Sequence, residues 1–78
     1  MTQADFDELD KATSTEFRVC KGESWSEGSG NEQVGISQYW RPDGERVRKT
    51  YRGVGGLLSI QIGENKTFLN PAYYPAES

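Results

Sequence analysis

The sequence predicts one small α+β domain, in which a short N-terminal helix packs on an antiparallel meander of four or five strands built around a central hairpin. Three features carry this prediction. Apolar side chains recur at helical spacing near the N-terminus, residues 15–69 hold several short runs with the alternating pattern of strands, and a Pro-Asp-Gly turn joins two of these runs. A chain of 78 residues has room for a single domain.

The helix is expected over residues 2–13. Thr2 and Asp5 have the spacing of an N-terminal capping box, and Phe6, Leu9 and Thr13 form a narrow apolar stripe along one side. A helix of about twelve residues is marginal in isolation. We therefore expect it to pack on the sheet that follows.

Alternating runs predict strands at residues 15–21, 33–41, 45–52, 57–62 and 66–69. Residues 22–32 are rich in Gly, Ser and Glu and are expected to form a loop. This loop carries Trp25, whose indole either folds back onto the core, which we favour, or remains available to a partner. Residues 70–78 contain two prolines and are expected to form an extended tail. The predicted core consists of Phe6, Leu9, Phe17, Val19, Val34, Ile36, Val47, Leu58, Ile60, Ile62 and Phe68.

Two registers are compatible with the hairpin around Pro42-Asp43-Gly44. A two-residue loop would place Trp40 opposite Val47, whereas a type I turn with a glycine bulge would place Trp40 opposite Arg46. Turn chemistry favours the second register because proline suits the second position of a type I turn, and side-chain matching favours the first. Both registers put three arginines on one face of their strand, namely Arg46, Arg48 and Arg52.

Charge is unevenly distributed along this chain, whose net charge is −3. Residues 1–38 hold eight acidic and three basic side chains, whereas residues 39–53 hold five basic and two acidic ones. The molecule is therefore expected to present surfaces of opposite sign.

Composition argues against several classes of function. The chain has no histidine and a single cysteine, Cys20, so we expect no zinc site, no internal disulfide and no cofactor. The carboxylate pairs Asp7/Glu8 and Glu23/Glu27 lack the apolar surroundings that raise the pKa of a catalytic acid. We expect a non-enzymatic protein. An acidic N-terminus and the lack of an apolar run of about 20 residues predict a cytoplasmic protein that makes no membrane contact.

The central hairpin supplies the predicted binding surface, because Trp, Tyr and Arg are enriched at the hot spots of protein–protein interfaces. The predicted partner-binding residues are Trp25, Tyr39, Trp40, Arg46, Arg48, Lys49 and Arg52. A second candidate surface is acidic and consists of Asp5, Asp7, Glu8, Asp10, Glu23 and Glu27.

In size, acidity and lack of catalytic residues the chain resembles the small accessory proteins with which phages bind and disable host machinery, anti-CRISPR proteins among them. This resemblance implies a stoichiometric inhibitor that acts inside a bacterial or phage-infected cell. It also implies that the acidic surface could act as a mimic of nucleic acid. The sequence thus predicts a binding module that docks on a protein partner and inhibits it. Two alternatives remain open: a hairpin that binds nucleic acid through arginine and aromatic side chains, and a structural subunit that forms a homodimer through the face of Cys20 or an exposed edge strand.

Overall fold

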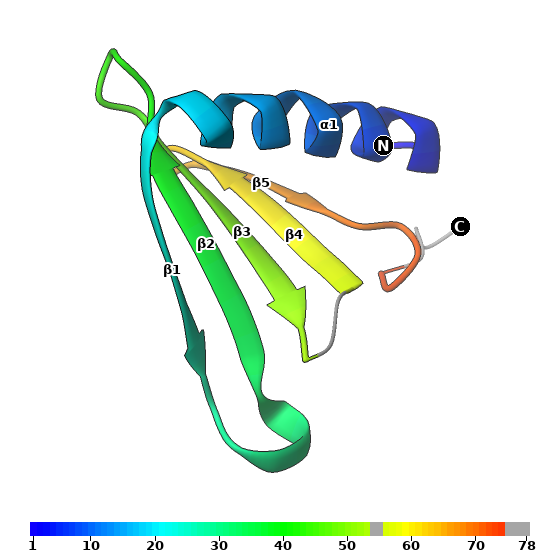
Figure 1. The fold of residues 1–78 in the computed structure, drawn as a ribbon. Coiled ribbons are helices and arrows are strands. Elements are labelled where there is room, and N and C mark those ends of the chain that lie inside the picture. Colours follow the sequence, from blue (N-terminus) through cyan, green and yellow to red (C-terminus); the bar gives the residue numbers. More distant parts are fainter. Residues whose placement is uncertain (54–55, 75–78) are drawn as a thin grey trace.

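One helix lies across one face of a five-stranded antiparallel sheet in the computed structural model, which describes residues 1–53 and 56–74 (Figure 1). The helix is α1 (Gln3–Val19), and a short 3-10 helix, η1 (Gly30–Glu32), lies between the first two strands. The strands neighbour one another in chain order, as β1 (Lys21–Glu27), β2 (Val34–Trp40), β3 (Arg46–Arg52), β4 (Gly56–Ile62) and β5 (Lys66–Leu69). The predicted α+β class, a helix on an antiparallel meander, is confirmed.

The helix begins as predicted and ends later. Thr2 caps it, since its hydroxyl accepts the backbone N–H of Asp5 at 3.1 Å. The helix continues to Val19 and so takes up most of the predicted strand at residues 15–21, which is therefore wrong. Thr13 and Thr15 are tolerated because their hydroxyls donate to helix carbonyls one turn earlier, at 2.8 Å and 3.1 Å. Val19, expected in the core, is 84% exposed at the helix end.

The segment expected to be a loop, residues 22–32, instead supplies most of strand β1. Seven residues of β1 pair with β2, from Lys21 opposite Trp40 to Glu27 opposite Val34. Trp25 consequently lies in mid-strand, opposite Ile36. The polar composition of β1 gave no strand signal, because strand formation there depends on pairing with β2 rather than on the pattern of its own side chains.

The hairpin between β2 and β3 adopts the second of the two predicted registers. Trp40 lies opposite Arg46, and Tyr39 lies opposite Val47. The N–H of Gly44 donates to the carbonyl of Arg41 at 2.8 Å, and Gly44 has a φ of 91°. This left-handed conformation is the glycine bulge that follows a type I turn with proline at its second position.

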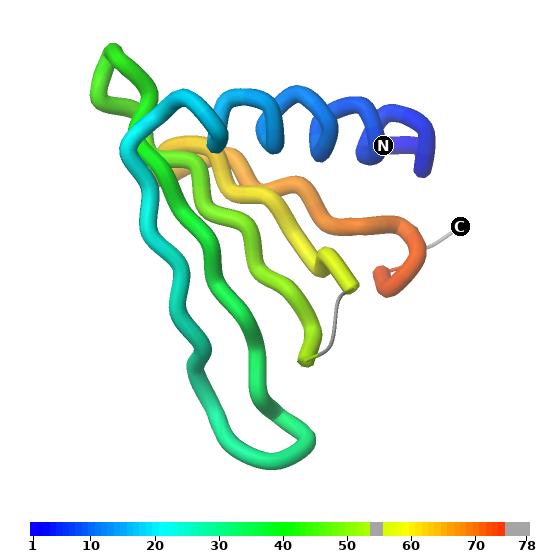
Figure 2. The backbone as a smooth tube through the Cα atoms, viewed as in Figure 1, coloured from blue at the N-terminus to red at the C-terminus, as the bar shows by residue number. Residues whose placement is uncertain are grey.

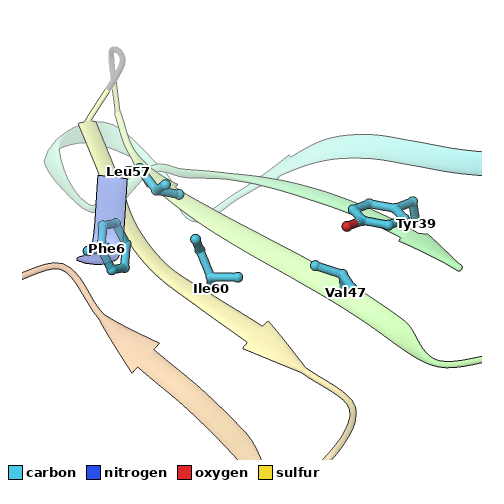
Figure 3. Packing of buried hydrophobic residues seen from close by; sticks show 5 residues of the cluster. All are labelled: Phe6, Tyr39, Val47, Leu57 and Ile60. Carbon is cyan, nitrogen blue, oxygen red and sulfur yellow. The ribbon is translucent and has the colours of Figure 1, made fainter. Parts of the chain in front are cut away.

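The hydrophobic core fills the space between α1 and the sheet (Figure 3). Phe6, Val47 and Ile60 are buried there as predicted. Leu9, Phe17, Ile62 and Phe68, also predicted, are partly buried against this cluster. The prediction missed two members of the cluster, Tyr39 and Leu57.

An irregularity in the β3–β4 ladder explains why Leu57, rather than the predicted Leu58, joins the core. The register shifts between Thr50 and Tyr51, so that Leu57 lies opposite Tyr51 while Ser59 lies opposite Thr50. Such a bulge redirects side chains that simple alternation would assign to the other face. Ile36 is buried too, but it lies outside this cluster, and Val34 is half-buried.

The tail does not run extended from residue 70 to residue 74, as we had expected. The carbonyl of Asn70 accepts the N–H groups of Tyr73 and Tyr74 at 3.0 Å and 2.9 Å, which folds this segment into a turn. The side-chain amide of Asn70 donates to the Leu57 carbonyl at 2.7 Å and ties the turn to β4. The rest of the predicted tail, 75–78, lies outside the described residues. Within the described chain, no helix has the length and apolar character needed to cross a membrane.

Candidate functional site

Alternation along β3 divides the basic residues of the hairpin between the two faces of the sheet. Tyr39 belongs to the core beneath α1 and its cross-strand partner is Val47, so Val47, Lys49 and Tyr51 face the helix. The positions between them face away from it. We call the side of the sheet turned away from α1 the open face. Along the central hairpin this open face carries Trp40, Arg46, Arg48 and Arg52.

Two predicted partner-binding residues, Lys49 and Tyr39, lie on the helix side and are buried. Lys49 is 3% exposed, and its ammonium donates to the Asp10 carboxylate, the Asp10 carbonyl and the Ser14 hydroxyl at 2.7, 3.0 and 2.7 Å. Tyr39 is 1% exposed and packs edge-on against Phe17. The pleat turns both side chains inward, so neither belongs to an exposed binding surface.

A polar network joins α1 to the hairpin at Glu16. Its carboxylate accepts the Tyr39 hydroxyl and the Arg41 guanidinium, the latter at 3.0 Å, while Arg41 also donates to Glu45 at 2.8 Å. Burial, together with the hydrogen bond to Glu16, raises the pKa of Tyr39, and the same hydrogen bond lowers the pKa of Glu16. Every member of this network is bonded within the fold, so we assign it a structural role.

The remaining three arginines of the hairpin have no such partners. Arg41 and Lys49 form ion pairs, but no described carboxylate lies within 4.0 Å of the guanidinium groups of Arg46, Arg48 or Arg52. The hairpin therefore uses two of its five cations to hold α1 and the turn. It presents the other three on the open face.

Trp40 is the most accessible ring on this part of the open face, with 39% of its surface exposed. It lies between two basic residues, with Lys21 opposite on β1 and Arg46 opposite on β3. Trp40 and Arg46 also line a shallow depression of about 370 Å³ together with Glu45 and Glu64. An indole with a cation on each side can contribute apolar contact area while the cations meet carboxylates of a partner.

Trp25 contributes to the same face through Arg48. The Arg48 guanidinium carbon lies 5.7 Å from the centre of the indole ring, in the range of a cation–π contact. Arg48 also donates to the Gln38 side-chain oxygen at 3.2 Å and 3.0 Å, and Gln38 donates to Glu23 at 2.5 Å. This chain of contacts fixes the guanidinium through a neutral amide.

The six residues of the predicted acidic surface do not lie together. Asp5, Asp7, Glu8 and Asp10 belong to α1 on one side of the sheet. Glu23 and Glu27 lie on the open face. Glu23 is opposite Gln38, whose side chain points away from α1, and Glu27 is four residues further along β1 and so points to the same side. Asp10 is bound to Lys49, Glu23 to Gln38, and Glu27 to the indole N–H of Trp25 at 2.7 Å. The structure thus separates the proposed mimic into two parts.

Another depression lies at the far end of β3 and has a volume of about 510 Å³. Among its described lining residues only Arg52 is charged, and Asn31, Gln33 and Tyr73 are polar. These side chains offer hydrogen bonds to a ligand but no pair of an acid and a base. Ser26 and Gly35, which also line it, belong to the helix side of the sheet, so we do not count this depression as part of the open face.

Sequence reasoning missed Lys21 as part of this surface, and it missed Gln38, which is 5% exposed, as the side chain that holds Arg48. Lys21 joins it only because β1 pairs with β2, and the loop predicted for that segment concealed the pairing. Gln38 could have been found from the hairpin register, which places it opposite Arg48.

Comparisons of this chain with protein-family models, with curated proteins and with solved structures found no match.

Proposed function

We propose that this protein is a non-enzymatic binding module that docks through its open face on an acidic surface of a protein partner and inhibits that partner by covering it. One observation carries the proposal. Trp40, Arg46, Arg48 and Arg52 share a sheet face that no described helix covers, and the described carboxylates leave the three guanidinium groups without an ion pair.

The residue types and their constraint support binding at this face. Trp and Arg are the side chains whose loss costs most at protein interfaces, often about 2 kcal/mol or more each. Arginine forms two parallel hydrogen bonds to a carboxylate, which gives direction as well as attraction. Arg48 is already held by Gln38 and Trp25, so it loses little freedom when a partner binds.

An acidic protein is favoured over nucleic acid as the partner. A nucleic acid carries a dense row of phosphates, and a chain of net charge −3 is repelled by it at long range. The open face also includes Glu23 and Glu27, which would lie near such phosphates. A protein surface can place a few carboxylates against the arginines without meeting these glutamates.

The inhibitory role rests on a separate argument, namely the resemblance in size and composition to phage accessory proteins. A stoichiometric inhibitor of that kind needs an interface of ordinary size, about 800 Å² on each partner. A five-stranded sheet, with one face that no element of the described chain covers, offers a surface suited to that task.

The test compares two variants with the same change in charge. R46E/R48E/R52E reverses the open face, and K11E/R18E/K66E reverses three exposed basic residues outside it. Tagged wild-type protein and both variants are used to capture proteins from an extract of cells that express the chain, with and without nuclease. Far-UV circular dichroism checks that both variants are folded.

We expect the open-face variant to lose the partner, with an affinity lower by roughly a hundredfold or more, as two to three hot-spot arginines predict. The matched variant should bind within about threefold of wild type. If both variants capture the partner equally well, the open face is not the binding surface. Capture that nuclease abolishes, and that falls steeply between about 50 and 200 mM salt, would assign the face to nucleic acid instead.

A further inference from the structure

Strand β1 is an edge strand of the sheet, and its outer edge is regular and exposed. It has seven residues, pairs with β2 over its whole length without a register shift, and contains no proline. All of its residues are exposed except Trp25, which is half-buried. Among the described residues its outer backbone N–H and C=O groups meet no further strand, and a regular edge of this kind can accept another strand.

The other edge of the sheet is much less suited to pairing. Strand β5 has only four residues. The chain then leaves the sheet in a turn, in which the Asn70 carbonyl accepts the N–H groups of Tyr73 and Tyr74, and Pro71 follows Asn70. A proline lacks the N–H that a continuing ladder requires. Of the two edges, β1 is therefore the one that can extend the sheet.

The sequence of β1 is complementary to itself when two copies run antiparallel. Full overlap of all seven residues places Ser24 opposite Ser24 of a second copy, and Lys21 opposite Glu27 on both sides of it. Opposite charges directly across an antiparallel pair stabilise it, and like charges destabilise it. Sliding either way by two residues brings Glu23 opposite Glu23, or Glu23 opposite Glu27. Charge thus selects the register that also has the most backbone pairs.

We propose that two copies of this chain associate through β1, antiparallel and centred on Ser24, to form a dimer with one continuous sheet. The partner is a second copy because the edge offers complementary charges to itself. The two-fold axis uses the same edge on both copies, so the assembly closes at two.

The surroundings of β1 leave room for a second copy. Figure 2 shows the β1–β2 hairpin extending beyond the area that α1 crosses, with β1 on the outer border of the sheet. Val19, which is 84% exposed, precedes this edge by two positions and would lie beside the turn that follows β1 of the second copy. Self-pairing would cover an apolar side chain that the single chain leaves in water.

The dimer would join the two open faces on the same side of the enlarged sheet. Trp25 would lie opposite Glu23 of the second copy, close to the two-fold axis, and its indole N–H already binds one oxygen of Glu27. The second oxygen of that carboxylate remains available to Lys21 of the other copy. This proposal rests on the outer edge of β1, whereas the proposed function rests on Trp40 and the arginines of β3, so the two stand separately.

The register is tested by disulfide formation in a C20S background, so that the introduced cysteine is the only thiol. In S24C two cysteines meet at the axis, whereas in S26C they lie about 13 Å apart along the strands, since residue 26 faces residue 22 of the other copy. We expect S24C to form a covalent dimer in a glutathione redox buffer at least tenfold faster than S26C. Equal rates would overturn the proposed register.

Charge reversal tests the interface itself, with molar mass measured by light scattering over a range of concentrations. K21E and E27K each place like charges opposite one another twice and should weaken dimerisation roughly tenfold. K21E/E27K exchanges the charges and should restore the dimer. A wild-type protein that stays monomeric or forms larger assemblies would contradict the proposal. So would a K21E/E27K variant that dimerises no more strongly than K21E or E27K. Lys21 borders the open face, so partner capture is scored with E27K, which keeps Lys21, Arg46, Arg48 and Arg52.

Discussion

Lys49 illustrates how the pleat of a strand decides the role of a residue. Its neighbour Arg48 points to the open face, whereas Lys49 enters the interface between α1 and the sheet and binds Asp10 and Ser14. A buried ammonium is tolerable only while its hydrogen bonds are satisfied, because its desolvation costs several kcal/mol. The cationic stretch of the sequence thus contains a structural lysine between two surface arginines.

This arrangement predicts unequal effects for the two partners of the ion pair. D10A leaves the buried ammonium without its carboxylate and should lower the free energy of unfolding by about 3 kcal/mol. K49M removes the charge and keeps the aliphatic length, while the side chain of Asp10, 42% exposed, stays solvated. We expect K49M to cost less than about 1.5 kcal/mol. Urea unfolding measures both, and a larger loss in K49M would contradict this account.

Several residue roles could be predicted from the sequence and others could not. The alternation that places Arg46, Arg48 and Arg52 together holds in either hairpin register, so it was available in advance. The sequence did not show which face α1 would cover, and without that knowledge Tyr39 and Lys49 could not be separated from the exposed set. Burial on a sheet is set by the element that packs on it, which local pattern does not specify.

At the scale of elements, the junction between α1 and β1 is where sequence prediction failed. Residues 15–21 alternate as a strand would, yet Phe17 also continues the apolar stripe of Phe6, Leu9 and Thr13 along a helix. Two periodicities were present, and packing of Phe17 on Tyr39 favours the helix. The β2–β3 hairpin was predicted correctly because Pro42-Asp43-Gly44 strongly favours a turn over the interior of a helix or strand.

The same junction explains the need for a glycine at position 22. A methyl group there would lie 2.9 Å from the Gln38 carbonyl oxygen and 3.0 Å from the Phe17 ring. At Gly35, on the neighbouring strand, the nearest described atom would be the Tyr51 Cβ at 3.8 Å, an ordinary contact. We expect G22A to lower the free energy of unfolding by about 1–3 kcal/mol, and G35A to change it by less than about 0.5 kcal/mol.

Urea or thermal unfolding of the two glycine variants provides the comparison, since each adds the same methyl group to a strand. Equal stability of G22A and G35A would show that α1 does not close tightly over the start of β1. A loss of stability in G35A but not in G22A would contradict the placement of α1 over the start of β1.

The whole molecule is electrically asymmetric. Its net charge is −3, and α1 places Asp5, Asp7 and Glu8 in exposed positions on one side of the sheet. The opposite side carries Arg46, Arg48 and Arg52 on β3, with Lys21 at the border. The charge distribution along the chain predicted two signs of surface. The fold shows where each of these surfaces lies, because the helix and the open face are on opposite sides of one sheet (Figure 1).

The most direct test of this asymmetry is the quenching of Trp40 fluorescence by iodide and by caesium, measured in W25F so that one indole remains. Net charge alone predicts that the cation Cs⁺ quenches better, since an acidic protein attracts cations. Our account predicts the reverse, with iodide more effective by about twofold or more and the preference lost in W25F/R46E/R48E/R52E. Caesium quenching equal to or stronger than iodide quenching in W25F would contradict the claim that accessible indole and unpaired guanidinium groups share the open face.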